Sequence, residues 1–144
     1  MRIIKSLATA LVLVAGIQAQ AVDTPTSLKN CKIVTAAEAK DLMGKGAKVF
    51  DVRNATEYAE EHIQGAEKLP YTEKSKKEVN FKASEDSFDD SKLPASKMIF
   101  QCNGKECWKS YKACLWADTK GKKELYWLRG GIPEWKASGF PTEK

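Results

Sequence analysis

Three short apolar segments, each followed by a helical pattern, most constrain the fold of this 144-residue chain. The segments span residues 48–52, 97–101 and 124–128. Strands that alternate with helices at this spacing predict an α/β domain with a mainly parallel central sheet flanked by helices. In such sheets, ligands bind beyond the carboxyl ends of the strands. We therefore expect functional residues at that edge, where Arg53, Cys102 and Arg129 follow the predicted strands.

Weaker patterns predict the remaining elements. Residues 31–35 form a candidate edge strand, and Thr35 with Glu38 has the spacing of a capping box at the start of a helix that ends near Gly44 and Gly46. A short helix is expected around residues 56–61, and a last helix contains Pro133 in its first turn. Residues 72–96 are rich in charged residues and serine, so we expect a surface excursion with one helical turn. Its apolar residues should pin it to the body: Val79, Phe81, Phe88 and Leu93.

The first 21 residues have the pattern of a secretory signal. Basic Arg2 and Lys5 precede an apolar stretch from residue 7 to residue 17, and Ala19 and Ala21 form a small-x-small cleavage site. The apolar stretch is shorter than the ~20 residues that span a bilayer, so we expect no stable membrane anchor. The sequence thus predicts a signal peptide (1–21), an N-terminal extension (22–30) and one domain (31–144), in a periplasmic or otherwise exported protein.

Composition excludes several kinds of partner. The net charge is +5, and it falls to +3 without the predicted signal, because only two basic residues are lost. Basic residues alternate with acidic ones, which is typical of a solvated surface and argues against nucleic acid as a partner. The chain has one histidine, His62, and no Cys-x-x-Cys pair, so the sequence predicts no metal site and no cofactor.

Cys102 is the strongest candidate for a reactive residue. It directly follows the apolar segment 97–101, and a polar loop with Gly104 separates it from the next helix. A sulfur at this place faces the first free N–H groups of that helix, which stabilise an anion, and Lys105 and Lys109 act in the same direction. An unperturbed thiol has a pKa near ~8.5, and such surroundings lower it, so that the thiolate becomes a nucleophile. The alternative is a buried structural cysteine.

Three sequence blocks resemble those of a single-domain rhodanese. They are residues 49–66, with Val49-Phe50-Asp51-Val52-Arg53 and His62-Ile63-Gln64-Gly65-Ala66; the cysteine loop 102–107; and Tyr126-Trp127-Leu128-Arg129-Gly130-Gly131-Ile132-Pro133-Glu134-Trp135, with Gly139-Phe140-Pro141 at the end. The resemblance implies a rhodanese-like three-layer domain and a sulfurtransferase. Cys102 would take up a sulfane sulfur as a persulfide and pass it to a thiophilic acceptor.

The resemblance also assigns roles to the neighbouring residues. Backbone amides of the loop would hold the anionic sulfur; they belong to Asn103, Gly104, Lys105, Glu106 and Cys107. Asp51 and Arg53 would support the loops around the site, as would Lys109 and Arg129, and His62 would be a structural, hydrogen-bonded residue. The implied partners are a small sulfur-containing donor (thiosulfate, polysulfide or a persulfide), a thiol or cyanide-like acceptor, and a protein sulfur acceptor.

Two positions depart from the family pattern. Glu61 stands where the family usually has glycine, and Cys107 ends the loop where many relatives have arginine. The loop therefore lacks a fixed cation and gains a second thiol beside Cys102. Phosphatases of this fold need a longer loop that ends in arginine, which binds phosphate through two hydrogen bonds, so phosphatase chemistry is disfavoured.

Three functions remain open at this point. The first is an exported sulfurtransferase, and the second is a thiol–disulfide or redox-sensing protein that uses Cys102 and Cys107. The third is a non-catalytic rhodanese-fold binding module that docks a partner through Trp108 and Tyr111. Export would also permit a structural disulfide between Cys31 and Cys114; otherwise Cys114 is a core residue.

Overall fold

The computed structural model describes residue 16, residues 21–78 and residues 80–144. The predicted signal peptide therefore lies almost wholly outside the described residues, as does Val79. Within the described residues, no helix has the length and apolar character needed to cross a membrane.

A five-stranded parallel sheet forms the centre of the molecule, as predicted, in the order β1-β6-β5-β2-β4. The strands are β1 (Cys31–Ile33), β2 (Lys48–Asp51), β4 (Glu67–Lys68), β5 (Met98–Gln101) and β6 (Leu125–Leu128). Asp51 pairs with Gln101, and Gln101 pairs with Leu128. Because the register is level, β2, β5 and β6 end at the same edge, and the next residues of each strand begin the loops that form the site.

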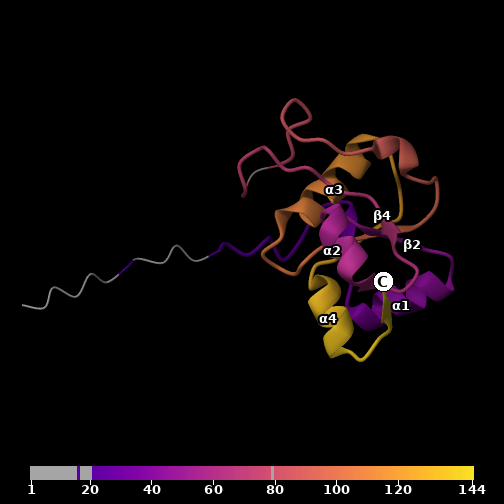
Figure 1. Cartoon of the computed structure of the whole chain (residues 1–144). Helices are drawn as coiled ribbons and strands as arrows, with labels where there is room; N and C mark the ends of the chain where they lie inside the picture. Colours follow the sequence, from indigo (N-terminus) through magenta and orange to yellow (C-terminus); the bar gives the residue numbers. More distant parts are fainter. Residues whose placement is uncertain (1–15, 17–20, 79) are drawn as a thin grey trace, which may run out of the picture.

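Helices cover both faces of this sheet. The helices are α1 (Ala36–Gly44), α2 (Ala55–Glu60), α3 (Trp108–Thr119) and α4 (Gly131–Ala137). Figure 1 shows α3 on one side of the sheet and α1 with α4 on the other. Phe100 of β5 packs in the cluster on the α3 side, whereas its neighbour Ile99 packs in the cluster with α1 and α4. This alternation of buried side chains produces the three layers expected from the sequence.

The predicted capping box opens α1. The Thr35 hydroxyl accepts a hydrogen bond from the Glu38 amide at 3.2 Å, and the Glu38 carboxylate accepts one from the Thr35 amide at 2.8 Å. Together these contacts satisfy two backbone donors that the first helical turn leaves free. The last helix, α4, starts at Gly131, so Pro133 lies in its first turn as expected.

A two-stranded antiparallel ribbon was not predicted, because its strands β3 (His62–Ile63) and β7 (Thr142–Glu143) are too short to show a pattern. His62 is buried in it: Nδ1 lies 2.8 Å from the Tyr58 carbonyl oxygen, and the ring stacks on that of Tyr58. This is the structural environment expected for His62. Glu61 has a φ of −165°, an extended conformation that does not require the family's glycine.

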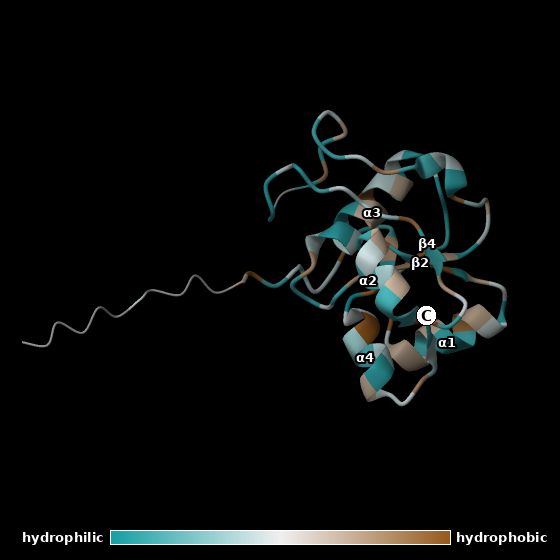
Figure 2. Cartoon of the chain, viewed as in Figure 1, coloured by the Kyte–Doolittle hydropathy of each residue, from teal (hydrophilic) through white to brown (hydrophobic). Residues whose placement is uncertain are grey.

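The polar excursion after β4 is attached to the α3 side of the molecule. It contains one 3₁₀ turn, η1 (Asp90–Lys92), and Figure 2 shows that much of it is hydrophilic. Phe88 and Leu93 are buried in the core, and Phe81 packs partly buried against it, as predicted for all three. Buried Asp86 fixes the excursion from within, since its carboxylate accepts hydrogen bonds of 2.7 Å from the Tyr71 hydroxyl and from the Ser75 amide.

Candidate active site

Cys102 and Cys107 form a disulfide at the carboxyl end of β5. Their α-carbons are 6.2 Å apart, and both residues line a cavity of about 350 Å³. Cys102 is buried in the core on the α3 side, with 1% of its surface exposed, whereas Cys107 is half-buried. Three carboxylates and two amines also line the cavity: Glu57, Glu73, Glu106, Lys77 and Lys109. The sequence-predicted Cys102, Cys107 and Lys109 therefore share one cavity.

The loop between the two cysteines is held by its own backbone and by α2. The Cys107 amide donates to the Gly104 carbonyl at 3.0 Å, so this amide is not directed at a sulfur. The Asn103 side-chain amide donates to Glu57 at 2.6 Å, which ties the loop to the first turn of α2. Cys107 is the residue that precedes α3, and the first N–H groups of a helix have no partner within it. The first N–H groups of α3 consequently favour negative charge beside the disulfide.

Gly131 lets the start of α4 approach the loop. Gly131 has a φ of +61°, and a β-carbon added there would overlap the carbonyl oxygen of Cys102. That carbonyl accepts a hydrogen bond from the Ile132 amide at 3.1 Å. A β-carbon on Gly130 would overlap the side chain of Glu134. Gly131 thus allows the contact that positions the residue carrying the buried sulfur, whereas Gly130 makes room for the Glu134 side chain.

Residues 22–24, which we call the N-terminal strap, hold the loop from outside. The Thr24 amide and hydroxyl both donate to the Lys105 carbonyl, at 2.8 and 2.6 Å. The Trp108 indole N–H donates to the Val22 carbonyl at 3.1 Å, and Asp23 lies 3.3 Å from the Lys105 ammonium. The predicted N-terminal extension therefore takes part in the architecture of the site.

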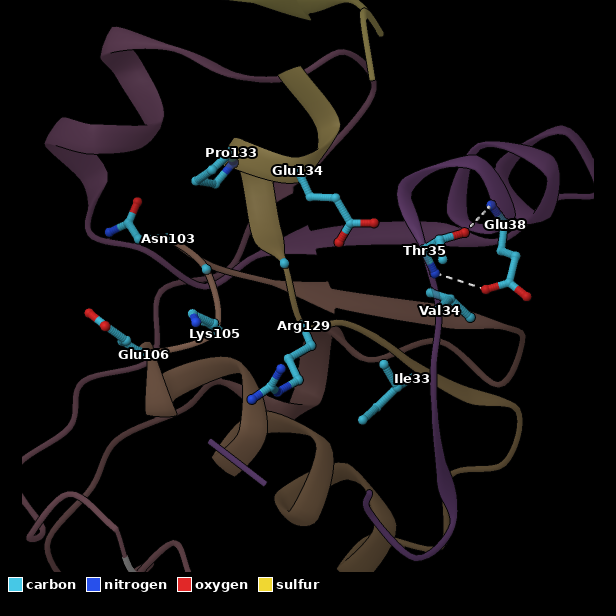
Figure 3. A pocket seen from close by; sticks show the side chains of 12 residues that line it. Ile33, Val34, Thr35, Glu38, Asn103, Lys105, Glu106, Arg129, Pro133 and Glu134 are labelled. Carbon is cyan, nitrogen blue, oxygen red and sulfur yellow. Dashed lines mark hydrogen bonds between the residues drawn. The ribbon is translucent and has the colours of Figure 1, made fainter. Parts of the chain in front are cut away.

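Arg129 binds this strap and does not line the cavity of the cysteines. Its Nη2 donates to the Thr24 carbonyl at 2.6 Å, and its Nε donates to the Thr24 hydroxyl at 3.1 Å. Arg129 lines a second cavity, of about 510 Å³, formed with Thr35, Lys105 and Glu134 (Figure 3). Here Glu134 accepts a hydrogen bond from the Ala36 amide at 2.9 Å. Arg129 follows β6 at the expected edge, but it lines a different cavity from that of Cys102 and Cys107.

Asp51 and Arg53 form a buried ion pair beside the site. Arg53 Nη2 lies 2.7 Å from Asp51, and the same nitrogen donates to the Glu61 carbonyl at 2.7 Å. These contacts connect the end of β2 with the turn after α2. Arg53 is thus engaged within the fold, and neither of the two residues lines the cavity of the cysteines.

The sequence did not predict a second buried ion pair, which joins Lys112 to Glu73. Lys112 is fully buried on α3; its ammonium lies 2.8 Å from Glu73 and donates to the Ser75 hydroxyl at 2.9 Å. Glu73 lines the cavity of the cysteines, so the pair joins the polar excursion to the active-site helix. The sequence contained a sign of this burial: Lys112 lies four residues after Trp108 and four before Trp116, so it shares one helix face with two large apolar side chains.

Trp108 and Tyr111 do not form an exposed docking surface. Trp108 has 6% of its surface exposed, and Tyr111 is half-buried. The Tyr111 ring packs edge-on against Trp108 and Trp127, and its hydroxyl contacts Asn80 at 3.3 Å. Trp108 is therefore not available as a docking contact, whereas Tyr111 stays partly exposed.

A second disulfide joins Cys31 of β1 to Cys114 of α3, with α-carbons 6.3 Å apart, and confirms the predicted pairing. It fastens the edge strand to the helix that follows the cysteine loop. Across residues 21–78 and 80–144, no group of three or more histidine, cysteine, aspartate or glutamate residues is arranged to hold a metal ion.

Comparisons with known proteins agree with this fold. A protein of Bacillus halodurans has 24% identity and a TM-score of 0.59, with 79% of this chain and 77% of that chain covered. The rhodanese-like domain of an Anabaena protein has 26% identity and a TM-score of 0.55, with 81% and 80% covered. A Rhodopseudomonas palustris protein, described as of unknown function and a possible tyrosine phosphatase, has 18% identity and a TM-score of 0.58, with 83% and 99% covered.

No curated protein matches the chain. The family model for the rhodanese-like domain matches residues 35–138, which include the cysteine loop and the glycine pair of α4. The chain therefore belongs to the rhodanese-like domain family.

Proposed function

We propose that this protein is an exported sulfurtransferase that carries sulfane sulfur as a persulfide on Cys102. The observation that carries the proposal is the placement of Cys102 directly after β5, at a cavity that also contains Lys109 and the start of α3. The free N–H groups of the first turn and the ammonium group favour a thiolate there. The signal-like residues 1–21 and the two disulfides support export, because disulfides persist in oxidising compartments.

The transfer consists of two displacements once a thiol reductant has opened the loop disulfide. The Cys102 thiolate attacks the sulfane sulfur of the donor, a sulfur–sulfur bond forms, and the rest of the donor leaves with the electron pair, as sulfite when the donor is thiosulfate. The acceptor, a thiolate or cyanide, then attacks the outer sulfur and regenerates the Cys102 thiolate. Loop amides of residues 103–106 would stabilise the anionic persulfide.

The experiment is intact-mass analysis of the reduced protein after treatment with thiosulfate, polysulfide or a low-molecular-weight persulfide. We expect the wild type to gain the mass of one sulfur atom and Cys102→Ser to gain none. Cys107→Ser should still load sulfur but release it at a different rate, because the neighbouring thiol is gone. The proposal fails if the reduced wild type gains no sulfur from any donor, or if Cys102→Ser loads and Cys107→Ser does not.

Thiol–disulfide exchange is the second candidate, and the disulfide between Cys102 and Cys107 is the observation that favours it. A redox protein of this kind requires the loop disulfide to equilibrate with partner dithiols. We would measure its reduction potential against defined thiol buffers. A bond that opens only in strongly reducing buffers, and does not equilibrate with periplasmic dithiol partners, excludes this function; sulfur loading of the chemically reduced protein is unaffected.

A further inference from the structure

The structure buries the two residues of the loop disulfide unequally. Cys102 is buried in the core on the α3 side, with 1% of its surface exposed, and Cys107 is half-buried at the start of α3. Displacement at a disulfide is in line: the nucleophile approaches one sulfur from the side opposite the other. Cys102 is almost wholly covered, so a nucleophile in the cavity reaches the partly exposed Cys107 more readily. The leaving group is then the Cys102 thiolate.

We propose that the oxidised loop captures hydrosulfide at Cys107. The hydrosulfide sulfur attacks Sγ of Cys107, a new sulfur–sulfur bond forms there, and the bond to Cys102 breaks with the electron pair on Cys102. The products are a Cys107 persulfide and a Cys102 thiolate; sulfide is oxidised to sulfane sulfur, and the disulfide is the oxidant. The Cys102 thiolate can next take the outer sulfur from Cys107, which leaves a Cys102 persulfide and a Cys107 thiolate.

The lining of the cavity favours this small nucleophile over a larger oxyanion. Glu57, Glu73 and Glu106 contribute three carboxylates against the ammonium groups of Lys77 and Lys109, and no arginine is present. A dianion such as thiosulfate gains from paired donors of the kind that a guanidinium supplies. Hydrosulfide needs no such donors, and near neutral pH it exchanges with uncharged H₂S, which can enter a cavity of mixed charge.

This inference deepens the proposed function, because both lead to a persulfide on the same loop. They start, however, from opposite oxidation states: hydrosulfide capture requires the loop disulfide, whereas transfer from thiosulfate requires the free Cys102 thiolate. The two can therefore fail independently.

The test uses the oxidised full chain and sodium sulfide, followed by alkylation and tryptic peptide mapping. Cleavage after Lys97, Lys105 and Lys109 places Cys102 and Cys107 on separate peptides, residues 98–105 and 106–109. At the earliest times we expect the additional sulfur on peptide 106–109, and later also on peptide 98–105. Glutathione is a second probe of the first attack; at the earliest times we expect its mixed disulfide on peptide 106–109, before further exchange can move it.

Cys107→Ser is the matched control, because it has no loop disulfide. Sulfide alone should add no sulfur to it, and any adduct measures polysulfide contamination of the reagent. The inference is overturned if oxidised wild type gains no more sulfur than this variant, or if glutathione attaches first to Cys102. Loading of the reduced wild type by thiosulfate, measured in parallel, shows whether the proposed function also fails.

Discussion

The α-carbon of Gly131 faces the carbonyl oxygen of Cys102 so closely that no β-carbon fits between them. The contact joins the start of α4 to the residue that bears the buried sulfur, and the Ile132 amide bonds to the same carbonyl. The position of Cys102 thus depends on β6 and α4 as well as on β5.

Gly131→Ala should displace the cysteine loop and destabilise the protein. The left-handed backbone alone costs an alanine about 1–2 kcal/mol. Gly139→Ala is the matched control, because Gly139 also has a positive φ, +74°, but no atom lies close to its added β-carbon. Thermal unfolding should show a larger loss for Gly131→Ala, and sulfur loading should decrease only in that variant. Equal effects of the two substitutions would contradict a specific role for this contact.

Lys112→Met should destabilise the protein by about 3–5 kcal/mol, because it leaves the carboxylate of Glu73 without its buried partner. The double variant Lys112→Met/Glu73→Gln removes both charges and should recover part of that loss. Urea unfolding of the wild type, the two single variants and the double variant gives the coupling energy. A double variant whose loss equals the sum of the two single losses would show that the ion pair contributes nothing.

Thr24→Val should loosen the cysteine loop while keeping the shape of the side chain. It removes the hydroxyl that donates to the Lys105 carbonyl and accepts from Arg129. Hydrogen exchange at residues 103–107 should accelerate, and the free energy of unfolding should decrease by about 1–2 kcal/mol. The control is Thr26→Val, at an exposed position two residues beyond Thr24. It should leave the hydrogen exchange and the free energy of unfolding unchanged. Unaltered exchange in Thr24→Val would argue against the strap as a support of the loop.

The stability contributed by Asp86 should depend on pH. Burial opposes its ionisation, but hydrogen bonds from Tyr71, Ser75 and Lys74 outweigh that effect and hold its pKa well below the usual range. A group whose pKa is depressed in the folded state stabilises the protein fully above its unfolded pKa, near ~3.9, and loses that contribution as the pH falls further.

Thermal unfolding of wild type and Asp86→Asn should therefore differ most near neutral pH. The difference should stay constant down to about pH 4 and shrink below it. A difference that does not change between pH 7 and pH 3 would contradict ionisation as its cause. The excursion, residues 72–96, should be the first part of the chain to gain proteolytic sensitivity in acid.

The sequence predicted the parallel sheet, the α1 capping box and Cys102 at the strand end, because these depend on local periodicity and on residues close together in the chain. It also suggested the pairing of Cys31 with Cys114. It did not predict that Arg129 would line another cavity and bind Thr24, 105 positions earlier in the chain. Nor did it predict the burial of Lys112, since a lysine on a helix is usually exposed, and only the tertiary contact with Glu73 makes its burial tolerable.

Helix α3 carries a disulfide at its start and another within it. The bond at Cys107 closes a short loop across five positions of sequence, whereas the bond at Cys114 spans 83 positions and joins two residues that are both buried. Constraint of the unfolded chain grows with the length of the closed loop. Opening the short bond therefore removes the constraint from only the few residues of the cysteine loop. While that bond is open, the long bond still joins α3 to β1. The proposed opening and closing of the loop disulfide would therefore leave α3 joined to β1.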